Sequence, residues 1–161
     1  MSLKLTENPD GSLLFTSTAP VVLENGDSLA QWQLCFEAWG TLNEQKNNVV
    51  LIHHALSVGS HVASSAINSQ KGWWQEMVGP GKAVDTNRFY VICINNLGSC
   101  FGSSGPMTIN SQTGLPWTSN FPVISMADMA MTQKRLLDYL GIEPLYAIIG
   151  NSMGAMVSLS W

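Results

Sequence analysis

The chain has 161 residues, enough to bury a sizeable hydrophobic core, and 45% of them are hydrophobic whereas only 11% are charged. So few charges suggest an interior part of a larger fold, and the net charge of −4 with scattered lysines and arginines gives no reason to expect a nucleic-acid partner. The N-terminus has no apolar signal-peptide core and no run approaches the roughly 18 apolar residues of a membrane helix, so a cytoplasmic protein without a membrane partner is predicted.

The first segment is predicted to form an antiparallel hairpin. Residues 13–23 and 30–39 have the composition of strands, and Asn25-Gly26-Asp27 between them is a turn signal. Apolar and polar residues alternate in the second arm, which predicts half-buried strands at the edge of a sheet. The apolar face carries Trp32, Leu34, Phe36 and Ala38, and the polar face carries Gln31, Gln33 and Glu37.

A continuous apolar run at 49–52 predicts a buried parallel strand that ends at His53 and His54. A loop of small residues follows and reaches His61. In open α/β sheets, such a loop at the carboxyl end of a strand is where sites are found. Three nearby histidines raise the question of a metal, but no carboxylate at ligand spacing accompanies them, so no metal site is predicted and structural hydrogen bonding is the favoured interpretation.

The middle of the chain is predicted to contain a second buried strand and a glycine-rich loop. Trp73 and Trp74 are interpreted as core packing rather than a ligand platform, and 89–94 is the strand. The glycines of 95–106 allow close backbone approach and suggest a functional loop. It has neither the Gly-Lys-Ser/Thr of a P-loop nor a G-x-G-x-x-G motif, so phosphate binding of that kind is rejected.

The three cysteines are expected to be reduced thiols, because they are odd in number and lack Cys-x-x-Cys spacing. Cys93 falls in the predicted strand 89–94 and is expected in the core. Cys100 falls in the glycine-rich loop and is a candidate for lining a pocket.

Ser125-x-x-Asp128 is a capping box that predicts a helix, which Gly141 ends. Its apolar stripe is interpreted as core rather than as a cofactor site. The stripe consists of Met126, Met129, Leu136, Leu137 and Leu140.

The C-terminal segment has the pattern of a nucleophile elbow. An apolar strand at 145–149 runs into Gly150-Asn-Ser152-Met-Gly154, and a helical pattern follows. Such a turn exposes the serine hydroxyl, needs glycines on both sides, and points the N–H groups of the helix at an oxyanion. The alternative is an ordinary serine in a glycine-rich turn.

Nine short segments in matching order strengthen the elbow interpretation. They are Glu37-Ala-Trp-Gly-Thr-Leu-Asn43, His54-Ala-Leu-Ser57, Gly72-Trp-Trp74, Val78-Gly-Pro-Gly-Lys82, Asp85-Thr-Asn-Arg-Phe89, Asn96-Leu-Gly-Ser-Cys100, Gly102-Ser-Ser-Gly-Pro106, Phe121-Pro-Val123 and Gly150-Asn-Ser-Met-Gly154. Together they resemble the homoserine O-acetyltransferases of the α/β-hydrolase superfamily over roughly residues 30–161. The resemblance implies a mostly parallel sheet that begins with an antiparallel hairpin.

The resemblance also implies an activity. The expected reaction moves an acetyl group from acetyl-CoA to the hydroxyl of L-homoserine in methionine biosynthesis, with Ser152 as the nucleophile. The backbone N–H groups of Leu56 and Met153 would form the oxyanion hole. Acetyl-CoA would be a co-substrate, with no permanently bound cofactor, and the full-length form is a candidate homodimer. The motifs do not separate acetyl from succinyl donors or homoserine from serine acceptors, and they assign no residue to CoA binding.

In this superfamily the triad acid and histidine follow the serine, but only nine residues follow Ser152 (161 − 152 = 9). His53, His54 and His61 all precede it. We therefore expect residues 1–161 to be the N-terminal part of one α/β-hydrolase domain, truncated after the elbow, without the lid and inactive alone. Two alternatives stay open, namely an esterase or thioesterase of the same fold and a non-catalytic truncated module.

Overall fold

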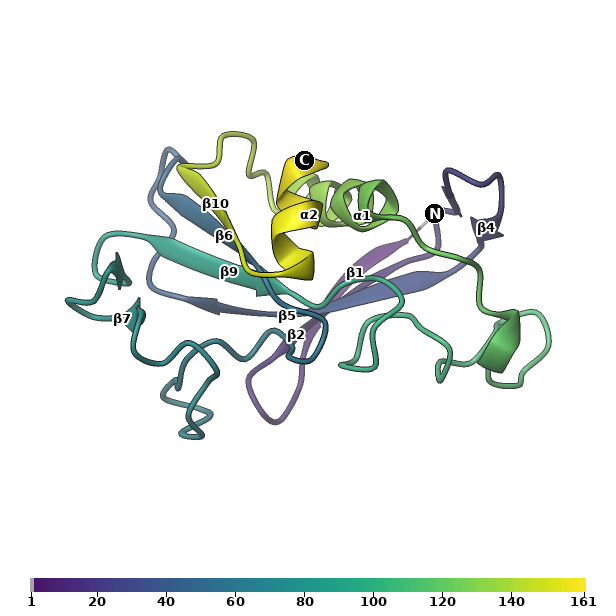
Figure 1. Ribbon diagram of the computed structural model, residues 1–161, viewed down its shortest axis with the longest axis horizontal. Coiled ribbons are helices and arrows are strands. Elements are labelled where there is room, and N and C mark those ends of the chain that lie inside the picture. The colour runs from purple at the N-terminus through teal and green to yellow at the C-terminus, as the bar shows by residue number, and fades with distance from the viewer. Residues whose placement is uncertain (1) are drawn as a thin grey trace.

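Six strands hydrogen-bond into one sheet in the computed structural model, which describes residues 2–161. In spatial order they are β1 (Leu3–Glu7), β2 (Leu13–Ser17), β5 (Trp32–Trp39), β9 (Tyr90–Ile94), β6 (Val49–His53) and β10 (Ala147–Gly150). Pairing is antiparallel from β1 to β9 and parallel among β9, β6 and β10. The predicted α/β class, with an antiparallel hairpin leading into parallel strands, is confirmed (Figure 1).

The predicted hairpin arms do pair, with Leu13 opposite Phe36 and Ser17 opposite Trp32. Their predicted place at an edge is wrong. An additional strand, β1, covers β2, and β5 lies between β2 and β9. The turn at 25–27 belongs to a separate short ladder of β3 (Val21–Val22) and β4 (Ser28–Leu29). Both faces of β5 are buried, including Glu37 on its predicted polar face, because β5 contributes to a hydrophobic core on each side of the sheet.

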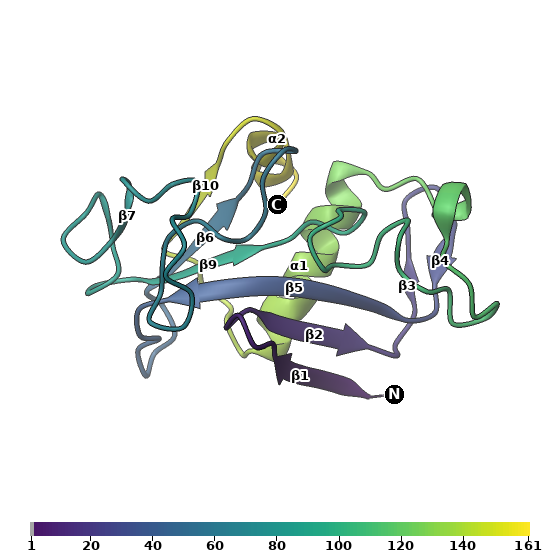
Figure 2. The ribbon, with the colours of Figure 1, turned by 90° about the horizontal axis from the view of Figure 1, so that it is seen from below.

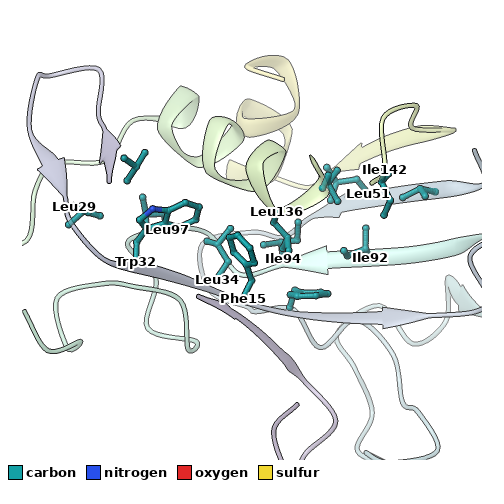
Figure 3. Packing of buried hydrophobic residues seen from close by; sticks show 14 of the residues in the cluster. Phe15, Leu29, Trp32, Leu34, Leu51, Ile92, Ile94, Leu97, Leu136 and Ile142 are labelled. Carbon is teal, nitrogen blue, oxygen red and sulfur yellow. The ribbon is translucent and has the colours of Figure 1, made fainter. Parts of the chain in front are cut away.

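Both α-helices, α1 (Met126–Tyr139) and α2 (Met153–Leu159), cover the same face of the sheet (Figures 1 and 2). Alternate side chains of β2, β5, β9 and β6 point towards α1 and form the larger core with it, as Figure 3 shows. Its buried members are Phe15, Val21, Leu23, Leu29, Trp32, Leu34, Phe36, Val49, Leu51, Ile92, Ile94, Leu97, Leu136, Leu137 and Ile142. Burial of this apolar surface is the main favourable term that holds helix and sheet together.

The predicted capping box of α1 is present, with Ser125 and Asp128 each accepting a hydrogen bond from the other's backbone N–H. The predicted stripe is correct at Leu136 and Leu137, which are buried, but Met126 and Met129 are only half-buried. The buried side of α1 instead includes three polar side chains, which are Asp128, Thr132 and Gln133.

The opposite face of the sheet is covered by the segment 54–89, which contains only one short parallel ladder of β7 (Val78–Gly79) and β8 (Val84–Asp85) (Figure 1). A second core lies beneath it. Its buried members are Trp39, Val50, Ile52, Val62, Ala63, Val78, Val84, Val91 and Cys93. Trp73 and Trp74 stack on each other with ring centroids 5.3 Å apart and pack against this core, so their interpretation as packing residues is confirmed.

The elbow strand β10 is half-buried along its length, although the sequence predicts a strand buried on both faces. It has one sheet neighbour, β6, and its other edge is free of strand pairing within residues 2–161. A strand at an edge keeps more solvent contact than one between two neighbours, which explains the difference. None of the helices within residues 2–161 combines the length and the hydropathy that crossing a bilayer requires.

Candidate active site

Ser152 lies between β10 and α2 in the chain, as the predicted strand–turn–helix arrangement requires. Figure 1 shows the tight turn that joins these two elements. Its backbone has φ 55° and ψ −121°, and its side chain is exposed. A positive φ is costly for a residue with a Cβ and is retained where the surroundings enforce it. The elbow therefore presents the Ser152 hydroxyl in a strained turn at the carboxyl end of a parallel strand.

The two flanking glycines are enforced by close backbone contacts. A Cβ on Gly154 would lie 2.1 Å from the carbonyl oxygen of His53, and one on Gly150 would lie 2.4 Å from the Gly154 oxygen. Real Cβ atoms do not approach backbone atoms so closely. The Gly-x-Ser-x-Gly pattern is thus required by the way α2 sits on the end of β6.

A cleft of about 620 Å³ opens beside the elbow. It is bordered by the loop after β6, the loop after β9, the start of α1 and the first residue of α2. The lining residues are His54, Leu56, Asn96, Leu97, Gly98, Ser99, Cys100, Phe101, Pro106, Met107, Thr118, Ser119, Phe121, Pro122, Ile124, Met129 and Met153. The lining includes Leu56 and Met153, the residues expected to supply the oxyanion hole. It also includes Cys100, which the sequence offered as a candidate for lining a pocket.

The backbone N–H groups of Leu56 and Met153 both remain available. Neither donates a hydrogen bond to any group within residues 2–161, and both residues border the same cleft. Leu56 is 75% exposed, at the outer part of its loop. Free N–H donors on two separate segments next to a nucleophile, here a loop and the first residue of a helix, are what an oxyanion hole needs.

The cleft is electrically neutral. No lysine, arginine, aspartate or glutamate lines it in the described part of the chain. The buried His54 ring donates from Nδ1 to the Ala55 oxygen (2.8 Å) and accepts at Nε2 from the Asn96 N–H (3.3 Å). The ring is therefore neutral and carries its proton on Nδ1. Burial lowers the pKa of His54, in agreement with this assignment.

His53 is also neutral, and its ring hydrogen-bonds to Ser158 rather than to Ser152. Its Nδ1 lies 2.8 Å from Ser158 Oγ, which donates to the Gly154 oxygen at 2.9 Å, so Nδ1 carries the proton. Burial lowers the pKa of His53 to about 4. His61 lies 2.8 Å from Glu37. Within residues 2–161 no histidine hydrogen-bonds to Ser152, so none is placed as its general base.

Sequence reasoning missed the polar side chains that connect the loops around the cleft. Asn95 and Asn96, at the end of β9, are both buried, and Asn96 accepts from Gln133 of α1 at 2.8 Å. Two consecutive asparagines directly after a buried parallel strand were a usable signal, because that end of a sheet collects functional residues. No group of three or more His, Cys, Asp or Glu side chains in the described chain is arranged to hold a metal ion.

Comparisons with known proteins agree on the fold. A family profile described as alpha/beta hydrolase fold matches residues 48–161. Among curated relatives, the homoserine O-succinyltransferase of Neisseria meningitidis serogroup B (strain ATCC BAA-335 / MC58) is 52% identical over 144 residues, which are 88% of this chain and 38% of that protein.

Two solved structures are similar over nearly the whole chain. Esterase E22 is 39% identical with a TM-score of 0.86, covering 93% of this chain and 43% of its own. Homoserine O-acetyltransferase from Bacillus anthracis is 37% identical with a TM-score of 0.85, covering 93% of this chain and 42% of its own. This chain therefore spans well under half the length of each of these three proteins.

Proposed function

Because this chain belongs to the α/β-hydrolase fold family, we propose that it forms the nucleophile-bearing part of a homoserine O-acyltransferase in which Ser152 is acylated. The observation that carries the proposal is the strained, exposed Ser152 beside a cleft with two free N–H groups. Homoserine O-acyltransferases among the relatives and solved structures support the acceptor and the reaction class.

In the proposed reaction, Ser152 Oγ attacks the thioester carbonyl of acyl-CoA. The N–H groups of Leu56 and Met153 stabilise the tetrahedral oxyanion, the C–S bond breaks, and CoA leaves with the proton that the serine gave up. The homoserine hydroxyl then attacks the serine ester, so that O-acylhomoserine leaves and Ser152 is restored. We expect the general base and its acid partner to follow Trp161, in the chain order that this fold uses.

Acetyl-CoA is the donor that we favour. The free carboxylate of a succinyl group is held best by a cationic partner, and no lysine or arginine among the described residues lines the cleft. The relative from Neisseria meningitidis is named as a succinyltransferase, so both donors belong in the test.

The test uses the protein expressed from the complete open reading frame, mixed with homoserine and either acetyl-CoA or succinyl-CoA. We expect release of free CoA and formation of O-acetylhomoserine, with serine as a poorer acceptor. CoA release that is faster with succinyl-CoA would correct the donor. No acyl product with either donor, from a folded protein, would reject the transferase proposal.

A second candidate is an esterase, which the similarity to esterase E22 favours. The elbow serves both reactions, because they differ only in whether water or an acceptor hydroxyl attacks the acyl-enzyme. The fate of the acyl-enzyme distinguishes the two reactions. A transferase acyl-enzyme should persist in water and collapse on addition of homoserine, whereas an esterase should hydrolyse it quickly with no effect of homoserine.

A further inference from the structure

The loop that carries Leu56 is anchored at both ends and open in the middle. At its start, the His54 ring is fixed between the Ala55 oxygen and the Asn96 N–H. At its end, the indole N–H of Trp73 donates to the Gly59 oxygen at 2.9 Å. Between these points the loop has one internal backbone hydrogen bond, from Val58 N–H to the Ala55 oxygen at 3.3 Å.

A further anchor lies on the face of the sheet opposite the helices, at Glu37 of β5. One carboxylate oxygen accepts from Ser60 Oγ at 3.0 Å, and the other accepts from His61 Nδ1 at 2.8 Å. Asn95 completes the anchor, because its side-chain oxygen accepts the Ser60 N–H at 2.6 Å and its amide donates to Ser60 Oγ at 3.1 Å. Glu37 is only 9% exposed, so its carboxylate is largely shielded from water.

The contacts of His61 require a charged ring. Its second nitrogen, Nε2, lies 2.9 Å from the backbone oxygen of Gln70. A carboxylate and a carbonyl oxygen can only accept, so both ring nitrogens must donate and the imidazole must carry both protons. The ring therefore ties the end of the Leu56 loop to β5 on one side and to residue 70 on the other.

We propose that Glu37 and His61 are positioning residues, and that their charged hydrogen-bonded pair fixes the loop 54–61 so that the Leu56 N–H points at the oxyanion formed on Ser152. This inference rests on the proposed acyl-enzyme chemistry. Glu37 and His61 themselves do not line the cleft. They act through Ser60, the one residue that separates His61 from Gly59, and through the contacts of Ser60 with Asn95.

The charge on His61 makes the anchor depend on pH. The groups that face the ring are Glu37 on β5, Asp10 in the turn before β2, and the Gln70 oxygen. Partial burial pulls the pKa of His61 down, but the Glu37 carboxylate and the Gln70 oxygen outweigh it and leave the pKa raised above its ordinary 6.5. The anchor is complete below that raised pKa and is lost as the pH rises through it.

The experiment uses the protein from the complete open reading frame. The wild type and the variants Glu37→Gln, His61→Asn and His61→Gln are compared in the burst of p-nitrophenol released from p-nitrophenyl acetate, which reports acylation of Ser152. His61→Asn can still donate to Glu37, and His61→Gln can still reach the Gln70 oxygen, but neither variant carries the charge. Gln70→Ala is the matched control, since only the backbone oxygen of residue 70 is used.

We expect the acylation rate constant of Glu37→Gln and of both His61 variants to fall by about tenfold, less than the roughly 100-fold or more that loss of an oxyanion donor costs. KM should change much less, and Gln70→Ala should behave as the wild type. The wild-type NMR titration of the His61 ring should give a pKa above 6.5, and the Leu56 amide signal should move with the same pKa.

An ordinary or lowered pKa for His61, or a Leu56 amide signal that ignores the His61 titration, would overturn the inference even if a variant failed to fold. Wild-type acylation rates in all three variants would overturn it as well. If the wild type showed no acylation of Ser152, the proposed function would fail instead, and the two NMR titrations would still decide whether His61 holds the loop.

Discussion

At the scale of single residues, the elbow depends on Gly150 and Gly154, because there is no room for a side chain at either position. Ser152 keeps a positive φ because α2 lies directly on the end of β6, with Gly154 against the His53 oxygen. The cost of this conformation, on the order of 1–3 kcal/mol, must be offset by the surrounding packing. The hydroxyl is exposed as a result, rather than turned into a hydrogen bond within the turn.

Replacing Gly154 with valine should damage the protein although Ser152 remains. Its Cβ would meet the His53 oxygen at 2.1 Å, and backbone atoms cannot move aside as a flexible side chain can. We expect a loss of at least about 1–3 kcal/mol in the free energy of unfolding, measured in urea, together with loss of acylation. Met156→Ala, at an exposed position of the same helix, is the control and should stay within about 0.5 kcal/mol. Unchanged stability and turnover in Gly154→Val would refute the assigned geometry.

At the scale of elements, α1 is held at its N-terminus by more than its own capping box. Asp128 Oδ2 accepts the Ser125 N–H at 3.0 Å, and its Oδ1 accepts the Glu24 N–H at 2.9 Å. The carboxylate therefore joins the start of the helix to the turn between β3 and β4. This second bond explains why a charged residue is buried on the inner side of the helix.

Ser125→Ala should cost about 1 kcal/mol, the usual effect of losing a helix N-cap. Asp128→Ala should cost more, because it leaves two backbone N–H groups without their acceptor, that of the N-cap Ser125 and that of Glu24 in the turn between β3 and β4. Thermal melting of both variants and of the double variant checks this. Equal effects of the two single substitutions would show that the bond to Glu24 does not contribute.

The local signals in the sequence identified much of the fold. Apolar runs located β6, β9 and β10, the capping box located α1, and Gly-x-Ser-x-Gly located the elbow. Long-range pairing was not visible to the same reasoning. The segment 3–7 alternates only two leucines with polar residues, too short a pattern to predict a strand, so the sequence does not predict β1 and places β5 at an edge.

The parts of the site that sequence reasoning missed are polar and buried. Periodicity places a polar residue on the outside, so the sequence pattern puts Glu37 on a polar face and gives no role to Gln133, although both are buried. They are buried because residues from distant segments of the chain hydrogen-bond to them. Ser60 and His61 bind Glu37, and Asn96 accepts a hydrogen bond from Gln133. Only the folded chain shows which polar residues will be paired in this way.

At the scale of the whole molecule, buried histidines should make stability fall in mild acid. The pKa of His53 is about 4 when folded and 6.5 when unfolded, so the unfolded chain binds the extra proton first as the pH falls. The free energy of unfolding should therefore decrease from pH 6.5 towards pH 4, by an amount on the order of 3 kcal/mol. Urea unfolding at several pH values tests this, and His53→Gln should flatten the dependence. A wild type equally stable at pH 4.5 and 6.5 would contradict it.

The 161-residue chain by itself should self-associate and should not transfer acyl groups. The edge of β10 is unpaired within residues 2–161, and exposed apolar side chains lie near it on α2 and at the chain end. Such edges promote aggregation, and only 11% of the residues are charged to oppose it. Sedimentation velocity should show oligomers or precipitate. A monodisperse, cooperatively melting monomer with acyltransferase activity would contradict both this expectation and the finding that no histidine within residues 2–161 is placed as the base for Ser152.

The central claim is that Ser152 is the nucleophile, and the most direct measurement is the mass of the protein from the complete open reading frame after brief mixing with acetyl-CoA and acid quenching. We predict a gain of one acetyl group, located on Ser152 by peptide mapping and removed when homoserine is added before the quench. Ser152→Ala should gain none, because removal of a triad nucleophile costs on the order of a 10⁶-fold in rate. An acetyl group on another residue, or acetylation of Ser152→Ala at the wild-type rate, would contradict the claim.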